Sequence, residues 1–261
     1  MDSETKNLLE DFQQSNKFKW QTKEADVIKL IDHAVKKPDL ETLKWFISNP
    51  PKDDDGIGWG PKTLYKQQCS EVVFPFLKND VDQSIAECIF ETLRKNGTSL
   101  YDERFYDSAF EVLHCAGPLA MESACFIVRT CPSPPQLWKR AVEFVCQQKA
   151  TENAPDIVIG IRNLPSSWSG TNIENAIVIG IKALMELDPT DRVALFSDLL
   201  SIDHQYRFFK ETLINALGNY GDEQASIALN KRLGGFFKKI EPDEKIRKKI
   251  QQAIHDIYIR T

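Results

Sequence analysis

An acidic triplet is the first candidate for a functional site in this chain. Asp53, Asp54 and Asp55 precede Gly56, much as carboxylates precede the obligatory glycine of a calcium-binding loop. In that register the opening carboxylate and the bidentate closing carboxylate would fall on a proline and a lysine, so both are missing. We therefore interpret the triplet as a solvated acidic loop tip and expect no metal or other cofactor.

Trp59 lies in the same loop, between two glycines. A tryptophan in such a position either contacts a partner, since tryptophan is enriched in interface hot spots, or folds back onto adjacent helices and holds the loop in place. Both interpretations stay open. The candidate partner contacts are Asp53, Asp54, Asp55 and Trp59.

Histidine and cysteine spacing predicts no catalytic or metal site. The four histidines have no second ligand at a recognised spacing. His114 and Cys115 are adjacent, and adjacent helical side chains point about 100° apart. Phosphate-binding glycine loops and the nucleophile elbow are absent from the sequence. We expect a protein that is not an enzyme.

Charge and cysteine content bound the cellular setting. The net charge of -5 argues against binding of nucleic acid or an anionic membrane by the whole chain. The six cysteines lie in apolar helical patterns, and the N-terminus lacks a basic segment followed by an apolar run. These features predict free, mostly buried thiols and a cytoplasmic protein that does not span a membrane.

The hydrophobic pattern has a period near 3.6 almost throughout, which predicts an all-α fold of about a dozen helices of roughly 10–18 residues. In the last segment, for example, Ile246, Ile250 and Ile257 share one face. The N-terminal helices are expected at 4–15, 24–36 and 39–48, followed by a loop at 49–61.

Capping residues precede several of these apolar runs, and glycines follow others. The expected caps are Asp39, Asp80, Ser133 and Asp188, and the expected ends lie at Gly97, Gly117, Gly218 and Gly221.

The segment 216–225, Ala-Leu-Gly-Asn-Tyr-Gly-Asp-Glu-Gln-Ala, is the most informative. It resembles the turn of the HEAT-like helical repeat family, with weaker echoes at 183–194 and 112–124. The resemblance implies an α-α superhelix, a solenoid of stacked antiparallel helix pairs. We expect one domain over 1–261, with HEAT-like repeats at 80–261 and an irregular N-terminal cap at 1–79. Gly221 is expected to need a positive φ, and Asp222 to cap the following helix.

The C-terminal stretch from residue 229 is locally basic. Lys231, Arg232, Lys238 and Lys239 are candidate contacts for an anionic partner; the alternative is a solvated helix face with favourable cations near helix C-termini.

The leading functional hypothesis is a non-enzymatic scaffold or adaptor that binds another protein through the solenoid surface, with its inner helices beginning near Pro118, Pro155, Asp188 and Asp222. One alternative is a nucleic-acid-binding, DNA-glycosylase-like HEAT protein, prompted by the tryptophans and the basic end. Another is a chromophore-handling helper similar to the phycobilin lyases.

Overall fold

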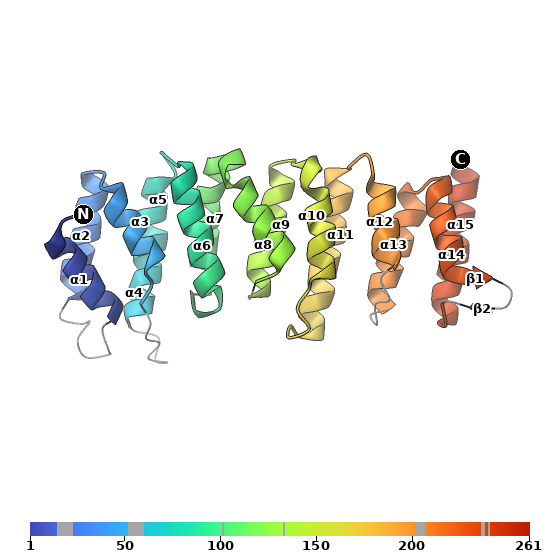
Figure 1. The fold of residues 1–261 in the computed structure, drawn as a ribbon, viewed down its shortest axis with the longest axis horizontal. Helices are drawn as coiled ribbons and strands as arrows, with labels where there is room; N and C mark the ends of the chain where they lie inside the picture. The colour runs from blue at the N-terminus through green and yellow to red at the C-terminus, as the bar shows by residue number, and fades with distance from the viewer. Residues whose placement is uncertain are drawn as a thin grey trace. The chain divides into compact units, whose positions relative to one another are not determined.

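A computed structural model describes residues 1–14, 23–51, 60–100, 102–132, 134–201, 207–235, 238–239 and 241–261. The predicted all-α class is confirmed, since fifteen α-helices fill most of these ranges and the only paired strands described are two residues each (Figure 1). The helices are α1 (Ser3–Gln14), α2 (Glu24–Lys36), α3 (Leu40–Ser48), α4 (Pro61–Gln68), α5 (Phe74–Leu77), α6 (Gln83–Leu100), α7 (Glu103–Ala116), α8 (Met121–Thr130), α9 (Pro135–Gln147), α10 (Ala154–Arg162), α11 (Gly170–Leu187), α12 (Arg192–Ser201), α13 (Arg207–Tyr220), α14 (Glu223–Leu233) and α15 (Glu244–Arg260). The strands are β1 (Gly234–Gly235) and β2 (Lys238–Lys239).

The chain divides into two compact units. Unit 1 comprises Met1–Ala124 with Pro132–Arg140, and unit 2 comprises Cys125–Cys131 with Ala141–Thr261. Helices α8 and α9 therefore have residues in both units.

In unit 1, the three predicted N-terminal helices are present with nearly the expected bounds, and the Asp39 carboxylate caps α3 by accepting the Thr42 N–H at 3.1 Å. The loop expected at 49–61 also agrees at both edges, because α3 ends at Ser48 and α4 begins at Pro61. A π-helical turn, Cys69–Val73, joins α4 directly to α5.

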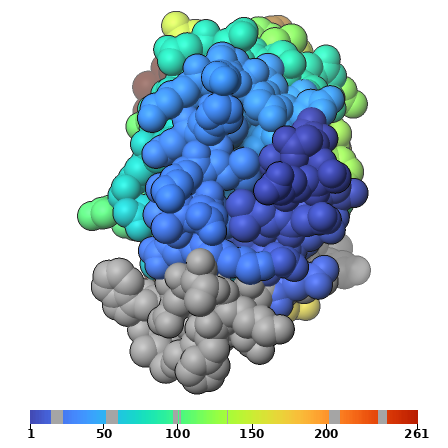
Figure 2. Space-filling view, turned by 90° about the vertical axis from the view of Figure 1, so that its left-hand side faces the viewer, coloured from blue at the N-terminus to red at the C-terminus, as the bar shows by residue number. Residues whose placement is uncertain are grey.

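A line of contacting aromatic rings forms the core of unit 1. Phe12 of α1 packs on Phe46, which contacts Tyr65, and Tyr65 and Phe74 both contact Phe105 at ring-centroid distances of 5.9 and 5.4 Å. The Tyr65 hydroxyl donates to a backbone carbonyl of α3 at 2.6 Å, which satisfies its buried O–H. Figure 2 shows α1, in dark blue, lying against the lighter blue residues that follow it.

The stretch Glu103–Thr130 contains an 18-residue window with a mean hydropathy of 1.3, of which 44% is buried. By length and composition alone it passes as a membrane span. However, α7 ends at Gly117, where φ is 54° and ψ is -127°, and a 3-10 turn precedes α8. Since α7 has 14 residues and α8 has 10, neither reaches the roughly 20 residues that a straight span requires.

Unit 2 contains three consecutive helix pairs, α10 with α11, α12 with α13 and α14 with α15. Helices α10, α12 and α14 also contact one another in order, as do α11, α13 and α15, so the pairs form two rows within this unit (Figure 1). The second row packs closely because Gly218 of α13 faces Ala253 of α15, where an added Cβ would lie 3.0 Å from the alanine methyl.

Several predicted helix ends were wrong. Asp82, and not Asp80, caps α6 by accepting the Ile85 N–H at 2.8 Å, and α6 continues through Gly97. Asp188 does not cap α12; it ends α11 in the left-handed conformation, with φ of 47°. Helix ends are hard to place because two nearby aspartates can both satisfy the capping pattern and only packing selects one.

The turn at Gly221 was placed correctly but for a wrong reason. Asp222 caps α14, as expected, by accepting the Gln224 and Ala225 N–H groups at 2.9 and 3.2 Å. Gly221 does not have a positive φ; among the described glycines that conformation belongs to Gly117 and Gly234. Gly221 is needed because a Cβ there would lie 2.2 Å from the Leu217 carbonyl oxygen. Gly218, expected at a helix end, instead lies inside α13.

Candidate partner-binding groove

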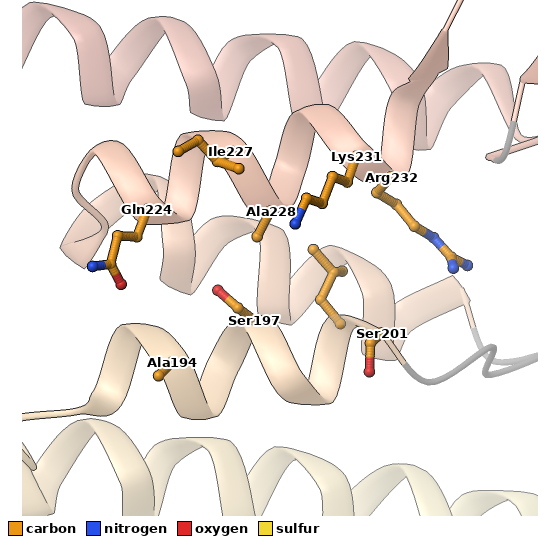
Figure 3. Close-up of a pocket in the computed structure, with 9 residues that line it drawn as sticks. Ala194, Ser197, Ser201, Gln224, Ile227, Ala228, Lys231 and Arg232 are labelled. Carbon is orange, nitrogen blue, oxygen red and sulfur yellow. The ribbon is translucent and has the colours of Figure 1, made fainter.

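An open groove lies between α12 and α14 of unit 2, with a volume of about 520 Å³ (Figure 3). It is lined by Ala194, Ser197, Leu200 and Ser201 of α12 and by Gln224, Ile227, Ala228, Lys231 and Arg232 of α14. A volume of this size falls within the range of ordinary ligand-binding clefts.

Helix packing decides which side chains line the groove. Leu195, Phe196 and Leu199 bury one side of α12, so Ala194, Ser197 and Ser201 fall on its opposite side. These are small residues spaced by three and four positions, and small side chains leave room between two neighbouring helices. The groove therefore exists because α12 presents short side chains where α14 approaches.

The wall formed by α14 is partly apolar and open to solvent. Ile227 is 50% exposed, which is unusual for a large aliphatic side chain in a helix whose Ala225 and Leu229 are fully buried. Leu200 of α12 forms the buried floor with 4% exposure. Figure 3 shows Ile227 and Ala228 of α14 across from Ser197 of α12.

The two cations in the lining differ in availability. The Arg232 side chain is 12% exposed, and its Nε lies 3.3 Å from an oxygen of Glu241, which is fully buried. Lys210 Nζ lies 3.1 Å from the same oxygen. Arg232 therefore already has a buried counterion, because a carboxylate removed from water requires compensating cations. Lys231 is exposed and forms no ion pair with any described residue.

The structure thus separates the four residues expected to contact an anion. Arg232 contacts the buried Glu241, whereas Lys231 is exposed, and the expectation that these residues contact an anionic partner stays a prediction. Lys238 and Lys239 form β2, which pairs antiparallel with β1 in the register Gly234 to Lys239 and Gly235 to Lys238. The lysine side chains of β2 lie outside the described atoms.

The acidic loop tip is not covered by the structure. Asp53, Asp54, Asp55 and Trp59 all lie outside the described residues, so their expected role as partner contacts stays a prediction.

The cysteines show no activated thiol among the groups with altered pKa. All six are free; Cys115 is exposed, Cys88 is half-buried and the other four are buried. The pKa of Cys125 and of Cys146 is raised to about 12, first by burial and then by a nearby carboxylate, Asp156 for Cys125 and Glu186 for Cys146. Such thiols are poor nucleophiles because the thiolate is the reactive form. Within the described ranges, no group of three His, Cys, Asp or Glu side chains is arranged to hold a metal ion.

Sequence reasoning missed the groove residues on α12. The signal was present, since Ala194, Ser197 and Ser201 repeat small residues along one helix face. Ile227 was also detectable, as an aliphatic residue on the side of α14 opposite to the buried Ala225 and Leu229. Neither pattern has a distinct chemistry, so only the approach of the two helices identifies them as a pair of walls.

No protein-family model and no curated protein matches this chain. Among solved structures, two crystal structures of engineered proteins are similar to it. One is 15% identical, with a TM-score of 0.36, over 98% of this chain and 68% of its own. The other is 16% identical, with a TM-score of 0.33, over 83% of this chain and 96% of its own. A likeness this weak carries no argument about function.

Proposed function

We propose that this chain is a non-enzymatic, cytoplasmic scaffold or adaptor that binds another protein through the surface of a HEAT-like α-α superhelix, without a cofactor. Ion pairs between every second helix along the chain support a repeating architecture, because the spacing of the paired residues is close to the length of one helix pair. They are Lys78 with Glu111 and Arg140 with Asp107, both 33 residues apart, within unit 1, and Arg162 with Asp198, 36 apart, and Lys249 with Glu211, 38 apart, within unit 2.

The observation that carries the proposal is the open groove between α12 and α14, with Ile227 half exposed on its wall. Helices beginning near Asp188 and Asp222 were expected to line the binding face, and α12 and α14 are those helices. Apolar side chains left in solvent at a concave site favour contact with a partner.

Nucleic-acid binding receives less support from the same structure. Trp138 is fully buried and Trp168 is 6% exposed, so neither can stack on a base. Arg232, part of the basic end that prompted this alternative, is paired with Glu241.

The proposal is tested by in-cell cross-linking of the full chain, with mass spectrometry to identify both the partner and the linked residues. We expect one protein whose cross-links concentrate on Lys231 and on the α10, α12 and α14 surface, and whose purified form binds the purified chain by calorimetry. Co-purification of nucleic acid in place of a protein, or cross-links confined to α11, α13 and α15, would contradict the proposal.

A matched pair of variants places the binding face. Ile227→Asp puts a charge on the groove wall, and Ile259→Asp makes the same change on α15, where Ile259 is 70% exposed and lies outside the groove. Because both side chains are solvent-exposed, both variants should fold. We expect the first to lose the partner and the second to retain it; equal retention would exclude the α12 and α14 face.

A further inference from the structure

We propose that the groove between α12 and α14 recognises a short acidic segment of the partner, in which an aliphatic residue and a carboxylate are separated by one residue. This inference rests on the proposed function and names the chemistry of its partner. The aliphatic side chain sits between Ile227 and Leu200, and the carboxylate pairs with Lys231.

The apolar half of the groove accepts one aliphatic side chain. Leu200 forms its floor, Ala228 and Ser197 leave space between the helices, and Ile227 offers a half-exposed wall. When an aliphatic group of the partner covers Ile227, apolar surface of both the partner and this chain is removed from water, which favours association.

Charge complementarity selects an acidic segment. Among the described residues, the lining contains Lys231 and Arg232 and no carboxylate, although the chain as a whole has a net charge of -5. Arg232 shares the buried carboxylate of Glu241 with Lys210, so Lys231 is the exposed cation of the lining. The carbonyl end of α14 carries a partial charge of only about -0.5. The full positive charge of Lys231 is larger than this partial negative charge, so the groove attracts anions.

Spacing along α14 sets the distance between the two recognised groups. Ile227 and Lys231 are one turn apart, which corresponds to about 6 Å along the helix axis. An extended peptide advances by about 3.3 Å per residue, and every second side chain points to the same side. An aliphatic residue and a carboxylate at positions i and i+2, in either order, therefore match Ile227 and Lys231.

The hydroxyls of the α12 wall complete the site. Ser201 Oγ is occupied, since it donates to the Asp198 carbonyl at 2.6 Å, whereas Ser197 Oγ makes no hydrogen bond with a described residue. Ser197 can therefore bond to the backbone of the bound segment, which leaves side-chain selectivity to Ile227 and Lys231.

The test uses a random library of 12-residue peptides selected against the full chain, followed by calorimetry with the enriched synthetic peptides. We expect the enriched peptides to share an aliphatic and an acidic residue at positions i and i+2. Ile227→Ala and Lys231→Glu should each weaken binding about tenfold, equivalent to about 1.4 kcal/mol. Lys231→Glu should also reverse the salt dependence, because the new carboxylate repels the acidic peptide and salt screens that repulsion.

Matched controls separate local from general effects. Lys245→Glu makes the same charge change on an exposed side chain of α15, and Ile259→Ala makes the same truncation; both should bind the peptides as the parent chain does. Circular dichroism of every variant confirms that the helices are intact.

Enrichment of basic or uncharged peptides, or equal binding by Lys231→Glu, overturns the acidic-segment inference. An absence of enriched peptides also overturns it. None of these results contradicts the proposed function, because in-cell cross-linking identifies a protein partner independently of peptide binding. Failure of cross-linking, conversely, removes the proposed function even if acidic peptides bind.

Discussion

Replacement of Gly221 by alanine is expected to destabilise the chain far more than a surface change. Gly221 lies between α13 and α14, and its N–H donates to the Leu217 carbonyl at 2.7 Å. An added Cβ would lie 2.2 Å from that oxygen and 2.4 Å from the Ala225 methyl. Carbon atoms pack favourably at about 3.5–4.0 Å, so the Leu217 carbonyl and the Ala225 methyl must each move by about 1 Å.

The magnitude follows from what that movement disrupts. Displacing the Leu217 carbonyl weakens a hydrogen bond with a net value of about 0.5–1.5 kcal/mol. Displacing the start of α14 weakens the Asp222 cap, which contributes about 1 kcal/mol. Overpacking alone costs about 1–3 kcal/mol. We expect a loss of about 2–4 kcal/mol for Gly221→Ala, and a larger loss for Gly221→Val, which adds two further carbons at the same contact.

Gly218→Ala is the matched control within the same helix. Its Cβ would lie 3.0 Å from the Ala253 side chain, a milder contact, while alanine gains up to about 1 kcal/mol over glycine inside a helix. We expect its stability to remain within about 1 kcal/mol of the parent.

Urea and thermal unfolding followed by circular dichroism measure both effects, with Tm falling by about 2–4 °C per kcal/mol for a chain of this size. Equal unfolding midpoints for the two variants would refute the close-approach argument.

Three further outcomes are expected. Glu241→Gln should lower the unfolding free energy by about 3 kcal/mol, because it removes the buried negative charge that Lys210 and Arg232 both contact; an unchanged urea midpoint would show that these ion pairs are not buried in solution. A thiol reagent should modify Cys115 first in the folded chain and reach Cys69, whose pKa is raised by burial, only after unfolding; early modification of Cys69, read by mass spectrometry, would contradict the packing of unit 1. The pKa of Glu91 is lowered to about 2 from 4.5, first by the hydrogen bond from Arg94, so its contribution to stability is complete above pH 4.5 and is lost as the pH falls through about 2. An NMR titration should show this lowered pKa of Glu91, and Arg94→Gln should move that pKa toward 4.5. A pKa of about 4.5 for Glu91 in the parent chain would show that its ion pair with Arg94 does not form in solution.

The helices themselves were predictable because their signals are local. A period of 3.6 in apolar residues requires no knowledge of neighbouring elements, and α2 and α3 begin and end within a residue of the predicted positions. Asp39 and Asp222 were recognised as caps for the same reason, since a cap bonds to N–H groups two or three residues away.

Errors arose where a local pattern had more than one solution. Asp80 and Asp82 both precede α6, and the chain enters the helix at the second. Asp188 satisfies the pattern of a cap for α12, yet its left-handed φ makes it the end of α11. At Gly221 the residue type was correct, but the constraint was a distance between two helices and not a φ angle.

The sequence by itself therefore determined that the chain is helical, where the first three helices lie and that the C-terminal region is basic. Tertiary structure alone decided which basic residues remain available. Arg232 and Lys231 are adjacent and chemically similar, but α14 buries one beside Glu241 and leaves the other in solvent. The groove has the same origin: Ser197 and Ile227 are 30 positions apart by their numbering, and they line one site because α12 and α14 pack side by side. Burial and contact between distant segments depend on packing, which no local pattern encodes.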